Sequence, residues 1–430
     1  MSRQQVCIRG HFVDTPDMDG GLRSLADGLL ILEQGRITWF GDYDEGRGRV
    51  PAGCPVETFP GRLIVPGFVD CHIHFPQMEI IGSHGARLLD WLTRYAFPAE
   101  EQYGDGRYAA AMAELFLDQL LENGTTTAMV FATVHGRSAE ALFLAAEQRN
   151  MRIICGKVLM DRNCPPSLRD TAASGYEESK QLIERFHGRG RLGYAVTPRF
   201  APTSSPAQLE LAGALRREFP DLAMQTHLAE TLDEIAWVRK LFPEREHYLD
   251  VYHQMGLTGE RALFAHCLHL EEAEWDLLAA TGSAIGFCPT SNLFLGSGLF
   301  DRARAGEKGI KVGLATDVGG GTSMNMLQTL REAYQVCRLQ GQACSPADLL
   351  YLATRGGAEA LGLADRIGSF APGREGDFIV LDPRATDLLA LRADRAGSVE
   401  ELLFALMILG DDRAVSHTYV AGKLVHGRDT

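Results

Sequence analysis

Pro66-Gly67-Phe68-Val69-Asp70-Cys71-His72-Ile73-His74 ends an apolar run with two imidazoles that lie two residues apart. Because side chains at positions i and i+2 of a strand face the same side, His72 and His74 can bind one metal ion together. Further candidate ligands follow other short apolar runs, in Thr-His-Leu-Ala-Glu, Phe-Ala-His-Cys and Leu-Ala-Thr-Asp-Val-Gly-Gly-Gly: His227, Glu230, His266 and Asp317. The pattern predicts a metal-dependent hydrolytic site spread over four strand ends.

The middle of the chain alternates apolar strands with amphipathic helices. We expect strands at residues 126–131, 152–159 and 263–265, and helices at residues 107–122 and 139–150. Alternating strands and helices imply a parallel sheet, and 430 residues fit one (β/α)₈ barrel with a smaller appended unit. The candidate ligands stand where strands stop and loops begin, which is where barrel enzymes carry their active sites.

Both ends of the chain have a different pattern, of short strands separated by turns. Strands are expected at residues 5–13, 28–34, 36–40 and 62–65, and again at 377–382 and at 417–425 with a turn at Ala421-Gly422. We therefore predict an α/β protein with two units. Residues 1–65 and 369–430 form a small β-sandwich, and residues 66–368 form a TIM-like (β/α)₈ catalytic barrel.

Composition limits the class of partner. A net charge of −14 disfavours nucleic acid, which requires a basic face. Nine scattered cysteines without Cys-x-x-Cys spacing argue against a disulfide framework or a thiolate zinc site. Neither a signal-peptide core nor an apolar run of about 20 residues is present. We expect a cytoplasmic protein that acts on a small molecule, without nucleic-acid or membrane partners.

Imidazole and carboxylate are the ligands that zinc favours, and a catalytic site leaves one position open for water. A single histidine at a strand end is more often a hydrogen-bonded structural residue, but these residues reinforce one another. Asp317 with the three glycines at 319–321 would also suit a turn or a phosphate loop, yet neither G-x-G-x-x-G nor a Walker pattern is present. The H-x-E and P-C-x-x-C signature of cytidine-type deaminases is absent as well.

Taken together, these motifs resemble the amidohydrolase superfamily over nearly the whole chain. Within it, Pro76-Gln77, the segment 89–100 and Thr197-Pro198-Arg199-Phe200 are similar to guanine deaminases. The resemblance implies hydrolytic deamination of guanine to xanthine and ammonia, one Zn²⁺ per chain and a homodimer. It implies metal ligation by His72, His74, His227 and Asp317, with His266 as a possible further ligand.

The same resemblance implies roles around the substrate. Arg199 and Gln77 hydrogen-bond the purine edge, and Phe200 and Trp91 shape the pocket around the ring. An arginine fork can read carbonyl and ring-nitrogen acceptors, and aromatic faces stack on bases. Without the resemblance, an ion-paired arginine and core aromatics would be preferred. The residues expected to contact substrate and move protons are Glu230, His266 and Asp317, where Asp317 accepts a proton from water, His266 polarises the nucleophile and Glu230 protonates the ring nitrogen and the departing ammonia.

Some alternatives stay open at this point. Lys157 stands near the position of a bridging lysine in two-metal members of the superfamily, although we interpret it as structural. His269 is either a second ligand or a loop histidine. The substrate could be another nitrogen heterocycle, such as a triazine, a pterin or an adenosine-like ring, acted on by a related deaminase or dechlorinase. A further alternative is a catalytically silent binding protein with the same fold. The presence of all four histidines, Asp317 and Glu230 at strand ends argues against it, because such a protein does not need a complete set of metal ligands.

Overall fold

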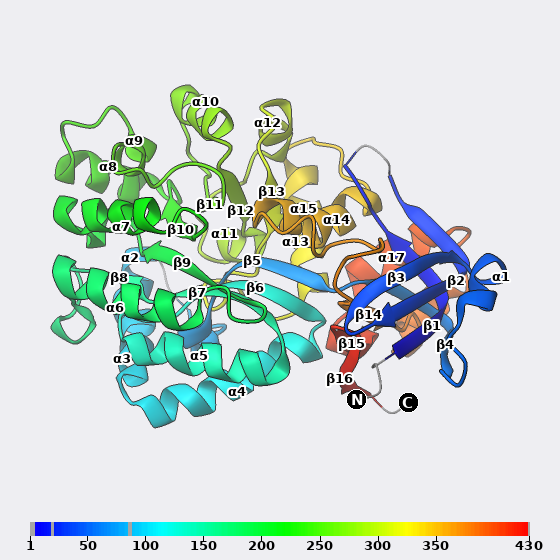
Figure 1. Cartoon of the computed structure of the whole chain (residues 1–430). Coiled ribbons are helices and arrows are strands. Elements are labelled where there is room, and N and C mark those ends of the chain that lie inside the picture. Colours follow the sequence, from blue (N-terminus) through cyan, green and yellow to red (C-terminus); the bar gives the residue numbers. More distant parts are fainter. Residues whose placement is uncertain (1–4, 19–20, 85–87, 429–430) are drawn as a thin grey trace.

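The computed structural model describes residues 5–18, 21–84 and 88–428, and its larger unit is a parallel barrel (Figure 1). Neighbouring strands pair in the order in which they occur along the chain. The eight barrel positions are β5 (Phe68–His74), β6 (Thr125–Phe131), β7 (Arg152–Gly156), β9 (Leu192–Pro198), β10 (Ala223–Leu228), β11 (Ala262–His266), β12 (Ala284–Phe287) and β13 (Val312–Leu314). The predicted (β/α)₈ barrel is confirmed.

The barrel closes between its first and last strands. The amide of Asp317, just after β13, donates to the carbonyl oxygen of His72 at 2.9 Å, and the amide of His74 donates to the carbonyl oxygen of Val318 at 2.9 Å. Three of these four residues are candidate ligands, and the fourth, Val318, follows Asp317 directly. The closing contacts therefore lie at the candidate site.

Helices cover the outside of the barrel, because each has one apolar face. In α4 (Gly106–Glu122), the buried residues Ala109, Ala113, Phe116 and Leu120 recur every three or four positions, and Asp105 caps the first turn by accepting from the amide of Arg107. The other helices between residues 136 and 360 are α5 (Gly136–Arg149), α6 (Ala172–Phe186), α7 (Pro206–Glu218), α8 (Leu232–Leu241), α9 (Tyr248–Gln254), α10 (Glu272–Thr281), α11 (Pro289–Phe294), α12 (Arg302–Glu307), α13 (Met326–Leu339), α14 (Pro346–Ala353) and α15 (Arg355–Ala360). No helix of the described ranges is long and apolar enough to cross a bilayer.

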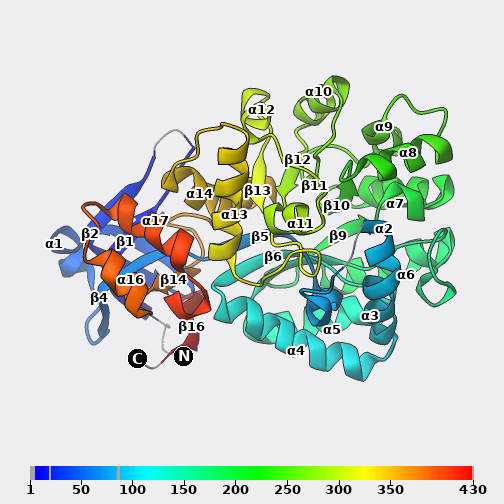
Figure 2. The same cartoon turned by 180° about the vertical axis from the view of Figure 1, so that it is seen from behind.

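The second sheet combines both ends of the chain and lies beside the barrel, as Figure 2 shows from behind. Its order is β16-β15-β14-β4-β1-β2-β3, so β4 from the N-terminal part pairs with β14 from the C-terminal part. The strands are β1 (Gln5–Asp14), β2 (Arg23–Glu33), β3 (Arg36–Asp42), β4 (Val56–Pro66), β14 (Phe378–Leu381), β15 (Val415–Val420) and β16 (Lys423–Gly427), accompanied by α1 (Tyr43–Gly46), α16 (Asp387–Ala393) and α17 (Val399–Leu409). The expected β unit from both termini is present, while the boundaries at 65/66 and 368/369 stay a prediction.

The strand expected at residues 152–159 is divided in two. β7 ends at Gly156, and β8 (Val158–Leu159) then pairs with β9. A Cβ atom at position 156 would lie 1.9 Å from the carbonyl oxygen of Ala195 in β9, so only glycine permits this close approach. Both pieces pair with β9, and the interruption falls at Lys157.

Buried ion pairs join the two units at the bottom of the barrel. Glu375, just before β14, accepts from Nε of Arg152 at 2.9 Å and pairs with Nη2 of Arg191 at 2.7 Å. Arg191 also pairs with Asp377. All four side chains are nearly inaccessible to solvent, which makes this contact a fixed junction.

Candidate active site

Three imidazole nitrogens and one carboxylate converge at the top of the barrel. Nε2 of His74 lies 3.2 Å from Nε2 of His72 and 3.2 Å from Nε2 of His227. Oδ1 of Asp317 lies 3.2 Å from Nε2 of His72 and 3.3 Å from Nε2 of His74. Tetrahedral zinc with Zn–N bonds of 2.0–2.1 Å separates its ligand atoms by about 3.3 Å. The four residues, here called the metal-site cluster, therefore have the spacing that one such ion requires.

The imidazoles are neutral and aimed at one point. Nδ1 of His227 lies 2.7 Å from the carbonyl oxygen of Arg199, so Nδ1 carries the proton and Nε2 offers a lone pair. Burial lowers the pKa of His74 to about 3 and holds the pKa of His227 well below its ordinary value. Metal binding needs unprotonated imidazole, so these shifts fit a ligand role.

Asp317 supplies the negative charge of the cluster. Burial opposes its ionisation, but hydrogen bonds from His72 and His74 outweigh that effect and hold the pKa of Asp317 well below its ordinary value. The residue adopts a left-handed backbone with φ of 51°, and His266 does so with φ of 71°. Such conformations are strained for non-glycine residues and collect at functional sites.

Glu230, in the loop after β10, and His266, at the end of β11, face the cluster. Nε2 of His266 lies 3.5 Å from Oε2 of Glu230 and 3.7 Å from Oδ2 of Asp317. Burial raises the pKa of Glu230, which favours its proton-carrying form. Burial alone would lower the pKa of His266, but Glu230 and Asp317 raise it. His266 groups with Asp317 and Cys288 rather than with the other imidazoles, so its ligation stays a prediction.

Residues outside the predicted set hold these groups in place. Ser297 donates to Oε1 of Glu230 at 2.9 Å, Glu234 accepts from the backbone amide of Glu230 at 2.9 Å, and Asn292 accepts from Nδ1 of His266 at 2.9 Å. Asn292 lies in α11 and Ser297 lies in the loop after it, and both are far from their partners in sequence. No local motif pointed to them.

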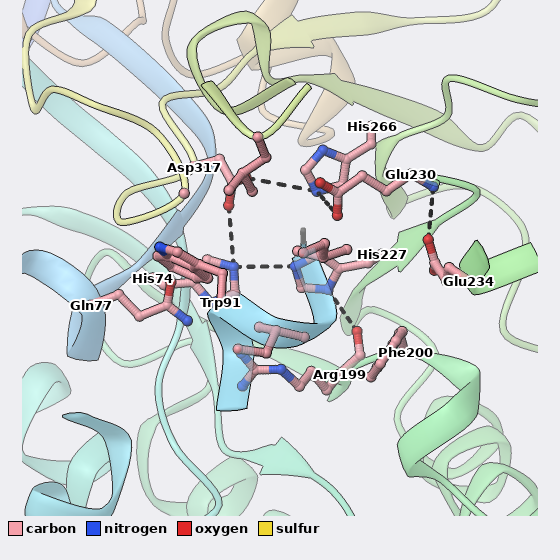
Figure 3. A pocket seen from close by; sticks show the side chains of 14 residues that line it. His74, Gln77, Trp91, Arg199, Phe200, His227, Glu230, Glu234, His266 and Asp317 are labelled. Carbon is pink, nitrogen blue, oxygen red and sulfur yellow. Dashed lines mark hydrogen bonds and ion pairs between the residues drawn. The ribbon is translucent and has the colours of Figure 1, made fainter. Parts of the chain in front are cut away.

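A pocket opens above the cluster, and the candidate ligands form part of its lining. Figure 3 shows that the predicted substrate residues Gln77, Trp91, Arg199 and Phe200 line it together with the candidate catalytic groups. Its lining residues are His74, Gln77, Leu88, Trp91, Leu92, Arg199, Phe200, His227, Glu230, Glu234, His266, Leu295, Asp317 and Gly320. The fourth imidazole of the predicted set, His72, lies beneath this lining and is fully buried.

Arg199 also forms an ion pair, but a buried one. Its Nη1 lies 2.7 Å from both carboxylate oxygens of Glu100, in α3 (Phe97–Glu101). Gln77 donates to Oε1 of Glu100 at 2.9 Å. Sequence reasoning assigned no role to Glu100, although it ends the segment 89–100.

The two uncertain residues lie outside the pocket lining. Lys157 is fully buried, with Nζ 2.7 Å from Asp170 and 3.3 Å from Glu178. Its charge is therefore compensated away from the metal-site cluster, as the structural interpretation expects. Nε2 of His269 lies 2.8 Å from the carbonyl oxygen of Ser297, so it contacts the loop that carries the partner of Glu230.

Comparison with known proteins agrees with this architecture. The model of the Amidohydrolase family matches residues 63–425. Guanine deaminase of Escherichia coli (strain K12) is 54% identical over 429 residues, covering 98% of each chain, and an E. coli guanine deaminase structure superposes with a TM-score of 0.97 over 99% of this chain and 100% of the other. A guanine deaminase from C. acetobutylicum, crystallised with guanine bound in its active site, is 29% identical with a TM-score of 0.90, covering 98% and 100%. The chain is a metal-dependent hydrolase that belongs to the amidohydrolase family and, within it, to the guanine deaminases.

Proposed function

We propose that this enzyme hydrolyses guanine to xanthine and ammonia, as part of purine breakdown or salvage. The observation that carries the proposal is the pocket itself. It brings the metal-site cluster, the buried acid Glu230 and the hydrogen-bond donors of Arg199 and Gln77 around one shared pocket. The 54% identical guanine deaminase supports the same substrate.

The metal-site cluster would hold one zinc ion per chain, through Nε2 of three histidines and Oδ1 of Asp317. The donor types and their 3.2–3.3 Å separations favour a tetrahedral ion with mixed nitrogen and oxygen ligands. Such an ion, when bound, makes a water molecule acidic enough to attack carbon near neutral pH. The remaining chemistry is proton transfer and belongs to the protein.

Two side chains, Asp317 and Glu230, move protons, and a third, His266, orients the nucleophile. Oδ2 of Asp317 is turned toward His266 and takes the proton that the attacking water loses. Nε2 of His266 orients the resulting oxygen. Oε2 of Glu230, whose raised pKa keeps a proton available, protonates the ring nitrogen as charge develops there. Glu230 then takes the proton of the new hydroxyl group and passes it to the amine, which leaves as ammonia. The proton on Asp317 restores Glu230 for the next turnover.

Substrate recognition would use the side of the pocket that faces Glu230 and His266, here called the substrate wall. Arg199 and Gln77 donate hydrogen bonds to acceptors on the purine edge, and Phe200 and Trp91 confine the ring. Trp91 is anchored by its indole nitrogen, which donates to the carbonyl oxygen of Ser83 at 3.1 Å. Phe200 packs edge-on against Trp237. These contacts keep the aromatic walls rigid, which favours a planar ring over a flexible substrate.

The decisive experiment measures ammonia release and the ultraviolet change from guanine to xanthine with purified protein, with metal content recorded on the same sample. We expect turnover with one zinc per chain. A panel of adenine, a pterin and an aminotriazine is assayed in parallel. Turnover of a panel member but not guanine would overturn the substrate, and two metals per chain would overturn the one-metal site.

We further propose a cytoplasmic homodimer. All nine cysteines are free thiols in the structure, which suits a reducing compartment. Light scattering should give twice the 47.1 kDa of one chain, and a monomer would contradict the dimer.

A further inference from the structure

Glu100 is a buried carboxylate that contacts both donors of the substrate wall. It has no solvent exposure, and Arg199 and Gln77 are 3% and 2% exposed. Its Oε1 accepts from Nη1 of Arg199 at 2.7 Å and from Nε2 of Gln77 at 2.9 Å, and its Oε2 accepts from the same Nη1 at 2.7 Å. One side chain from α3 therefore fixes two residues that come from different strand ends.

Each of the two donors is held at a second point on the metal side of the pocket. Oε1 of Gln77 accepts from the amide of Gly319 at 3.2 Å, two residues beyond Asp317. The carbonyl oxygen of Arg199 accepts from Nδ1 of His227 at 2.7 Å. Glu100 consequently fixes the guanidinium of Arg199, whose backbone carbonyl is tied to His227, and the amide of Gln77, which is also tied to the loop after Asp317.

The contacts also determine which donors remain for a ligand. Within the described part of the chain, the guanidinium of Arg199 forms hydrogen bonds through Nη1 alone, so the N–H groups at Nε and Nη2 stay available. The ring of Phe97 lies 5.3 Å from the guanidinium carbon and supports its flat face. Gln77, with its oxygen and one N–H already used, offers one remaining N–H.

We propose, on the basis of the guanine deaminase function proposed above, that Glu100 is a positioning and specificity-determining residue. It aims the donors of Arg199 and Gln77 at the purine edge and compensates the charge of the buried arginine, so that the pocket selects an uncharged ring bearing acceptor atoms. A buried arginine without its carboxylate would instead attract an anion. Glu100 thus distinguishes the neutral substrate from deprotonated oxopurines, including the ionised form of the weakly acidic product.

The test compares Glu100→Gln with Glu101→Gln. Glu101 is the next residue of α3, is exposed, and contacts Ser167 rather than the pocket, so it is a matched control. We expect Glu100→Gln to raise KM for guanine about tenfold or more, to change kcat less, and to leave the metal content unaltered. We also expect xanthine to inhibit this variant more strongly above neutral pH than it inhibits the wild type.

A double-variant cycle separates positioning from folding. In an Arg199→Gln background, Glu100→Gln should have a smaller effect on KM than in the wild type, because Arg199 is already gone and only the contact with Gln77 is left to lose. Equal KM values for Glu100→Gln and Glu101→Gln would overturn the proposal. So would additive effects in the cycle, or a Glu100→Gln protein that loses metal and melts earlier without a change in KM per active site.

Glu100→Asp covers the case in which Glu100→Gln does not fold. It keeps the charge but shortens the reach, so KM should rise without stronger xanthine inhibition, and an unchanged KM would count against positioning. The wild-type assay distinguishes this inference from the proposed function. Silence of the wild type toward guanine refutes the function, whereas normal wild-type turnover with an unaltered Glu100→Gln variant refutes only the inference.

Discussion

The backbone carbonyl oxygen of Arg199 lies 2.7 Å from Nδ1 of His227, while the side chain of the same arginine faces the pocket. Because a carbonyl can only accept, the contact fixes the tautomer of His227 and directs its Nε2 at the metal-site cluster. Under the proposed function, one residue serves metal binding through its backbone and substrate binding through its side chain. Substitutions at position 199 can separate the two.

Replacement of Arg199 by lysine should raise KM for guanine at least tenfold and leave the metal content unchanged. A lysine cannot reproduce the planar fork of donors, but its carbonyl oxygen still accepts from His227. Steady-state kinetics and metal analysis on one preparation test the rise in KM and the unchanged metal content together. Metal loss in Arg199→Lys would show that the side chain also supports the cluster.

Glu230→Gln should keep its metal and lose about 10²-fold or more in kcat, because the amide cannot carry the proton to the ring nitrogen. The amide can still accept from Ser297, so the local structure is preserved. Rates and metal content are compared with the Glu101→Gln control. A near-normal rate with bound metal would remove Glu230 from the mechanism.

His227→Ala should release the metal and abolish turnover, and chelation of the wild type should do the same reversibly. A ligand that binds only the folded state stabilises it, so the chelated protein should also melt at a lower temperature. Differential scanning calorimetry before and after addition of zinc measures this shift. Full activity after exhaustive chelation would exclude a catalytic metal.

Glu375→Gln should destabilise the protein by about 3 kcal/mol at neutral pH, because Arg152 and Arg191 would lose a buried carboxylate. Burial opposes ionisation of Glu375, but the two arginines outweigh it and lower its pKa from 4.5. A lowered folded pKa adds stability that is complete above pH 4.5 and is lost as the pH falls through the folded value. Urea unfolding between pH 3 and 7 should therefore show a weaker acid dependence in the variant, and parallel curves would contradict this role.

The sequence alone predicted those parts of the site that local pattern encodes. The period of two in His72-Ile73-His74, and the apolar runs before His227, His266 and Asp317, depend only on neighbouring residues, and the structure places all these side chains together. For Arg199, the family resemblance implied substrate binding, whereas the residues alone favoured a surface ion pair. The structure shows it buried and facing the pocket at once.

What the sequence did not reveal depends on contacts between distant segments. Ser297 and Glu230 are 67 residues apart, and Arg199 and Glu100 are 99 apart, so no local motif records either contact. The division of the strand at residues 152–159 has the same origin, because it depends on how closely Gly156 approaches Ala195 of another strand. Tertiary packing decides these features.

The two hydrogen bonds that close the barrel, from Asp317 to His72 and from His74 to Val318, join segments separated by most of the barrel sequence. Bringing such distant segments together has a large entropic cost. An ion bound jointly by His72, His74 and Asp317 would link the first strand of the barrel to the segment after its last strand, and would stabilise the closed barrel. Hydrogen exchange at the amides of His74 and Asp317 would then be slow only while the metal is bound. The exchange rate at the closure of the barrel would therefore report metal occupancy.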